Sequence, residues 1–185
     1  RSPLPSAAYS FFIITLIIHT LYKFFLCRVY DNSELSYGYP LARGTPSLIV
    51  LFVTPLIFSD ELTISNIFSV SVLCFGIILL IFADSRFKKI NLKGLSYALL
   101  VALMIAIYTI VDALGSRASD AIVYLIYYFA FDGIIFNLLA ILFLKNSNLS
   151  LSFFKKYSKE ILISAILASY SYFPAVYGFT VAKVA

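Results

Sequence analysis

The chain has 185 residues, of which 62% are hydrophobic and 12% charged, and its formal net charge is +5. Soluble domains are typically about half apolar and about a quarter charged, so this composition excludes an ordinary soluble fold, and the mean hydropathy of +0.96 indicates an integral membrane protein. The basic residues lie mainly between apolar runs, where lysine and arginine set membrane orientation. We therefore expect no nucleic-acid partner.

Six apolar runs have the length, about 19–26 residues each, that a helix needs to cross a hydrocarbon core about 30 Å thick. In chain order they cover approximately residues 6–27, 41–59, 64–83, 94–116, 121–144 and 160–185. The last run reaches the final residue, so we expect the chain to be part of a longer protein. The sequence predicts an all-α, polytopic bundle of transmembrane helices.

The first run carries a polar face near its middle. His19 is the only histidine, and Tyr22 and Lys23 follow it at positions i+3 and i+4, which places the three side chains on one side of a helix. Because a histidine changes charge near neutral pH, we interpret His19 as a proton acceptor that lines a cavity with Tyr22. The alternative is a structural histidine satisfied by one interhelical hydrogen bond.

The segment before the second run is rich in glycine, proline and tyrosine, and Pro55 interrupts the run itself. In a membrane, a helix broken by such residues indicates a substrate site, because the freed backbone groups need partners inside the protein or a polar cavity. Arg43 is expected at the N-terminus of this helix, where its guanidinium can hold a carboxylate or phosphate. The neighbouring Tyr39 is a second ligand contact. The alternatives are an arginine that sets topology and an aromatic-belt tyrosine.

Two aspartates lie within predicted transmembrane helices, where ionisable residues are costly and functional by default. Asp112 follows Tyr108 by four residues on the same helical face, and Asp132 lies at the middle of the fifth run. Both are interpreted as groups that bind substrate or protons, with Tyr172 of the last run as an aromatic wall. The alternatives are an Asp112–Arg117 pair at a helix end and a neutral Asp132 that packs against another helix.

Three motifs together resemble the drug/metabolite transporter superfamily, EamA-like branch. They are His-x-x-Tyr at residues 19–22, Tyr-Pro-Leu-Ala-Arg-Gly-Thr-Pro at 39–46 with Glu61 about one helix later, and Tyr-Thr-x-x-Asp-x-x-Gly-x-Arg at 108–117. The resemblance implies a ten-helix fold of two inverted five-helix repeats. Residues 1–90 would then supply three helices of the first repeat, and residues 91–185 three helices of the second.

The resemblance also implies a secondary transporter of the cell (inner) membrane, which exports small metabolites, amino acids or drugs by alternating access, with protons as a coupling ion. No cofactor or metal is expected, and the oligomeric state stays open. The basic loops place the connection after the first run in the cytoplasm, whereas the family layout places it outside. The expected substrate-binding residues are Arg43, Tyr39, His19, Tyr22, Tyr108, Asp112, Asp132 and Tyr172.

Two other classes of function are less favoured. An intramembrane enzyme acting on lipid would need a catalytic set, yet the sequence has neither a His-Glu-x-x-His nor a Gly-x-Ser-x-Gly motif. A non-transporting structural membrane protein would favour small packing residues over intramembrane charges. We therefore do not expect an enzyme.

Overall fold

A computed structural model describes residues 5–58, 63–83, 91–143 and 155–181, and that part of the chain is helical with no strand. Its helices are α1 (Ser6–Asn32), α2 (Leu35–Phe58), α3 (Ile64–Ala83), α4 (Leu92–Arg117), α5 (Ala121–Phe143) and α7 (Ser158–Val181). The all-α prediction is confirmed. By length and composition, α1, α2, α4 and α7 are each able to cross a membrane. The division into two five-helix repeats stays a prediction, and Glu61 lies outside the described residues.

Helix α1 extends past the predicted end at residue 27 and stops at Asn32. Ser33 ends it by adopting an extended backbone, with φ −137° and ψ 152°. Its backbone N–H and its hydroxyl both donate to the carbonyl of Val29, at 2.8 Å and 2.6 Å. Helix α2 then begins at Leu35, so a very short connection joins the two helices.

Helix α2 is continuous over Leu35–Phe58, although Pro40, Pro46 and Pro55 lie inside it. The predicted break at glycine and proline is therefore wrong. A proline removes one backbone hydrogen bond, but membrane helices tolerate this loss where neighbouring groups satisfy the freed carbonyl. The expectation that Arg43 lies at a helix N-terminus is also wrong, because α2 begins about two turns before it.

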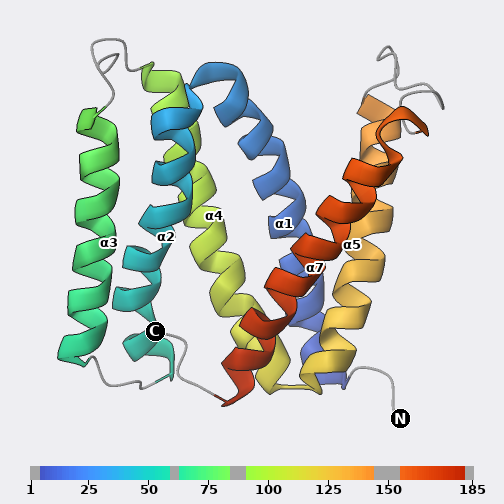
Figure 1. Ribbon diagram of the computed structural model, residues 1–185. Helices are drawn as coiled ribbons and strands as arrows, with labels where there is room; N and C mark the ends of the chain where they lie inside the picture. Colours follow the sequence, from blue (N-terminus) through green and yellow to red (C-terminus); the bar gives the residue numbers. More distant parts are fainter. Residues whose placement is uncertain (1–4, 59–62, 84–90, 144–154, 182–185) are drawn as a thin grey trace.

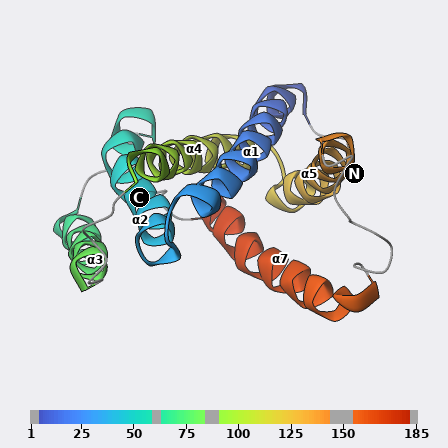
Figure 2. The same cartoon turned by 90° about the horizontal axis from the view of Figure 1, so that it is seen from above.

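Helix α4 is the centre of the bundle and packs against α1, α2, α5 and α7. Figure 1 shows α2 and α3 on one side of α4 and the pair α5 and α7 on the other. The view in Figure 2 shows α3 at the outer edge, next to α2, and α7 running obliquely away from the remaining helices. A polar side chain on α4 can therefore contact several helices at once.

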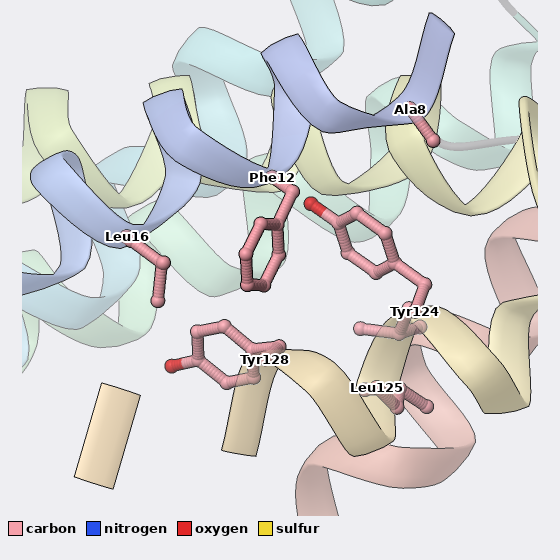
Figure 3. Close-up of a cluster of buried hydrophobic side chains, with 7 residues drawn as sticks. Ala8, Phe12, Leu16, Tyr124, Leu125 and Tyr128 are labelled. Carbon is pink, nitrogen blue, oxygen red and sulfur yellow. The ribbon is translucent and has the colours of Figure 1, made fainter. Parts of the chain in front are cut away.

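Two apolar clusters divide the interior. The first joins the N-terminal half of α1 to α5 and α7, and Figure 3 shows Phe12 and Leu16 of α1 facing Tyr124 and Tyr128 of α5. The second joins the C-terminal half of α1 to α2 and α4, with Tyr22 and Tyr108 among its members. Along α1, the buried members of the first cluster end at Leu16 and those of the second begin at Tyr22. The buried His19 lies between these two positions, so a polar group is placed where the two clusters meet.

Large apolar side chains cover much of the outside. In α7, Leu162 is 61% exposed, Ile166 58% and Tyr170 78%. The same helix packs inward through Tyr172 and Val176 near its C-terminal end. Exposed apolar surface of this kind fits contact with lipid, which supports the prediction of a membrane protein.

Gly94 allows α4 to approach the end of α1. A Cβ added at Gly94 would lie 2.5 Å from the carbonyl oxygen of Asn32 and 2.8 Å from the Cβ of Ser33. Because the carbonyl belongs to the backbone and cannot rotate away, we expect Gly94→Ala to lower the free energy of unfolding by about 1–3 kcal/mol. Titration of the detergent-solubilised protein with SDS, followed by circular dichroism, measures this change.

Gly178 of α7 provides the matched control, because a Cβ added there meets nothing within 4 Å. Gly178→Ala is expected to leave stability unchanged or to raise it by up to about 1 kcal/mol through better helix propensity. Equal stability of the two variants would contradict the close approach of α1 and α4 at Gly94.

Candidate functional site

Asp112 of α4 is the centre of a buried polar cluster and is only 1% exposed. Thr15 of α1 and Tyr172 of α7 donate hydrogen bonds from their hydroxyls to its carboxylate. The hydroxyl of Tyr124 in α5 donates to Oδ1 at 2.9 Å. One carboxylate thus connects α4 to α1, α5 and α7.

His19 is the second polar centre, is 3% exposed, and lies at the middle of α1. Its Nε2 is 3.4 Å from Oδ2 of Asp112, and its Nδ1 is 2.9 Å from the hydroxyl of Tyr128 in α5. When Tyr128 donates to Nδ1, the imidazole N–H is on Nε2 and points at Asp112. The ring stacks on Tyr108 with a centroid distance of 4.0 Å and an interplanar angle of 28°.

We call this group the Asp112 cluster; its members are Thr15, His19, Asp112, Tyr124, Tyr128 and Tyr172. Three hydroxyls and one imidazole face a carboxylate that offers about four acceptor positions, so the ionised carboxylate is fully satisfied. A proton added to Asp112 converts one acceptor position into a donor, and one neighbouring donor must then turn or leave. Since the donors belong to α1, α5 and α7, binding a proton changes the bonds between helices.

Arg43 of α2 adjoins the Asp112 cluster through Tyr22. Its Nη2 donates to the hydroxyl of Tyr22 at 2.8 Å. The guanidinium carbon lies 5.6 Å from the ring centre of Tyr22 and 5.7 Å from that of Tyr39, as in cation–π contacts. Tyr22 in turn makes edge contacts with His19 and Tyr108, at 6.1 Å and 5.7 Å between ring centres.

Asp132 of α5 belongs to a separate ion pair. Its Oδ2 accepts a hydrogen bond from Lys23 of α1, whose Nζ also lies 4.9 Å from the ring centre of Phe136. Its Oδ1 is buried and has no hydrogen-bond partner among the residues that the structure describes. Asp132 therefore bonds to Lys23 and not to the Asp112 cluster.

The structure brings most of the predicted residues together. His19, Asp112 and Tyr172 are hydrogen-bonded to one another. The other predicted binding residues lie around these three, except Asp132, which belongs to the separate ion pair. Arg117, the alternative partner of Asp112, instead donates from Nε to the carbonyl of Phe179 at 2.8 Å. The alternative of an Asp112–Arg117 pair at a helix end is therefore wrong, because the Asp112 carboxylate is buried and bonded to other side chains.

Thr15, Tyr124 and Tyr128 are not among the residues predicted from the sequence. The available signal is a four-residue spacing in both helices, which places side chains on one face. Three links between α1 and α5 follow this spacing, namely Thr15 with Tyr124 through Asp112, His19 with Tyr128, and Lys23 with Asp132.

No protein-family model, curated protein or solved structure matches this chain. The resemblance to EamA-like transporters therefore stays a prediction, and functional inference depends on the geometry of the site.

Proposed function

We propose that this protein is a membrane secondary transporter that moves a small metabolite, amino acid or drug by alternating access and uses Asp112 as its proton-binding group. The buried carboxylate of Asp112, bonded to side chains on three other helices, is the observation that supports this proposal most. Ionisable groups placed inside membrane bundles typically mark substrate or proton pathways.

The proposed coupling follows from the hydrogen-bond arrangement. With Asp112 ionised, hydroxyls from α1, α5 and α7 converge on the carboxylate. With Asp112 protonated, at least one of the four donors around the carboxylate, the three hydroxyls or the His19 imidazole, has to reorient or leave, and the relative stability of two helix arrangements changes. A ligand or proton shifts a two-state equilibrium only through such a difference in binding between the states.

Proton movement in proteoliposomes tests this function. The full-length protein is reconstituted with a pH-sensitive dye in the lumen, and amino acids, nucleosides, organic acids and cationic drugs are added one at a time. We expect at least one compound to move protons, and we expect Asp112→Asn to reduce that signal to background. Asp31→Asn is the matched control, because Asp31 is exposed and pairs with Arg28 at 3.8 Å on the surface of α1.

Two outcomes would overturn parts of the proposal. Flux of a radiolabelled substrate that keeps its wild-type pH dependence in Asp112→Asn would remove the proton-binding role. Absence of flux for every compound, from protein shown to be folded by circular dichroism, would contradict the transporter itself.

A further inference from the structure

A groove of about 380 Å³ lies between α2, α3 and α4. Small-molecule sites typically enclose about 300–1,000 Å³, so the groove suits a small ligand. Its polar lining residues are Arg43, Ser47, Asn66, Ser69 and Thr109, and valine, leucine, isoleucine and proline side chains complete it. It therefore offers one cationic group, several neutral polar groups and an apolar wall.

Among the described residues that line this groove, Arg43 is the only charged one. A guanidinium stays protonated in proteins, and a charge within a transmembrane helix normally has a partner. The ion pairs within the described residues join Lys23 to Asp132 and Arg28 to Asp31, His19 lies 3.4 Å from Asp112, and none of these contacts includes Arg43. The described part of the chain thus supplies Arg43 with a hydroxyl and two aromatic faces but with no carboxylate.

The guanidinium is held in place from one side. Tyr22, which accepts the hydrogen bond from Nη2, is only 7% exposed and is fixed by its contacts with His19 and Tyr108. A guanidinium has five N–H donors in a rigid fork, which matches the two oxygens of a carboxylate or phosphate. One donor is used by Tyr22, so the remaining ones can bind a ligand in the groove that Arg43 lines.

We infer that this groove binds a small organic anion, and that Arg43 holds its carboxylate or phosphate group while the apolar wall contacts its hydrocarbon part. The inference rests on the proposed transport function, since it names the class of substrate for that function. Binding at equilibrium does not require flux, however, so the two claims can fail separately.

Calorimetric binding to the full-length protein in detergent tests the inference. The probes are benzoate and phenyl phosphate, which share an apolar ring and differ in their anionic group, and neutral benzamide, which has the same ring without the charge. We expect both anions to bind and benzamide to bind at least about tenfold more weakly, because hydrogen bonds to charged groups are the stronger ones. Comparison of the two anions distinguishes a carboxylate ligand from a phosphate ligand.

Four variants locate the binding site. Arg43→Gln is expected to weaken anion binding at least about tenfold, and Arg43→Lys, which keeps the charge without the fork, less than that. Thr109→Ile adds bulk to the groove lining while Arg43 itself is kept, and it is expected to weaken both anions. Arg28→Gln is the control, because Arg28 is exposed and pairs with Asp31, and it is expected to bind as the wild type does.

Equal affinity for benzoate and benzamide, unchanged binding in a folded Arg43→Gln or Thr109→Ile variant, or no binding of either anion by the folded wild type would each overturn the inference. If the anions bind but no compound is transported, the anion site stands and the transport function fails. If a cationic or neutral compound is transported and Arg43→Gln leaves that flux unchanged, the transport function stands and the anion site fails.

Discussion

Asp112→Leu is expected to lower the free energy of unfolding by about 3–5 kcal/mol. A buried polar group that loses its hydrogen-bond partner costs about 1–3 kcal/mol, and several buried hydroxyl groups have this carboxylate as their partner. The hydroxyls of Thr15, Tyr124 and Tyr172 all donate to Asp112. Leucine leaves them without that acceptor in a site from which water is excluded. SDS titration followed by circular dichroism measures the loss.

Two comparisons separate lost hydrogen bonds from a general effect of substitution. Asp31→Leu on the exposed surface of α1 is expected to change stability by no more than about 0.5 kcal/mol. Combining Asp112→Leu with Thr15→Val, Tyr124→Phe and Tyr172→Phe removes the donors together with the acceptor, and this variant is expected to regain part of the loss. An Asp112→Leu protein as stable as Asp31→Leu would show that the cluster contributes nothing to the fold.

Lys23→Met is expected to destabilise the protein by about 1–3 kcal/mol, because it leaves the Asp132 carboxylate without its one hydrogen-bond donor in the described structure. The side chains of Lys23 and Asp132 are 25% and 12% exposed, so the loss should fall below the about 3–5 kcal/mol found when a fully buried pair is broken. The double variant Lys23→Met/Asp132→Leu removes both charges and should lose less than the sum of the two single variants. A double-mutant cycle from SDS titrations gives the coupling energy.

The surface pair Arg28–Asp31 provides an internal reference for this cycle. Its side chains are 51% and 64% exposed and its N–O distance is 3.8 Å. Exposed pairs of this kind typically contribute less than about 1 kcal/mol. A coupling energy between Lys23 and Asp132 that does not exceed the value for Arg28 and Asp31 would contradict a stabilising role for the intramembrane pair.

The helical class and the approximate helix bounds could be predicted because length and hydropathy alone determine which segments can cross a membrane. His19 and Asp112 could be found for a related reason, since ionisable residues are rare in apolar runs and attract attention wherever they occur. Thr15 and Tyr128 could not be found in this way. Hydroxyl-bearing residues are common in membrane helices, so the four-residue spacing only marks candidates, and the packing of α1 against α5 identifies those that meet a partner.

The prediction for α2 failed for a different reason. Glycine and proline weaken an isolated helix, and a single sequence does not show what a neighbouring helix provides. Gly44 is buried where α2 meets α3, and a Cβ added there would overlap the side chain of Ile77. At this position the glycine permits close helix packing, so the residue that indicated a break belongs to a continuous helix.

The tyrosines that surround Asp112 and His19 combine two contributions in one side chain. The rings of Tyr124 and Tyr128 belong to the apolar cluster between α1 and α5, while their hydroxyls bond to Asp112 and His19. Exchange with phenylalanine keeps nearly all of the ring volume and removes one hydroxyl. Natural variation at these positions can therefore change the number of hydrogen-bond donors around Asp112 and His19 without reshaping the apolar core.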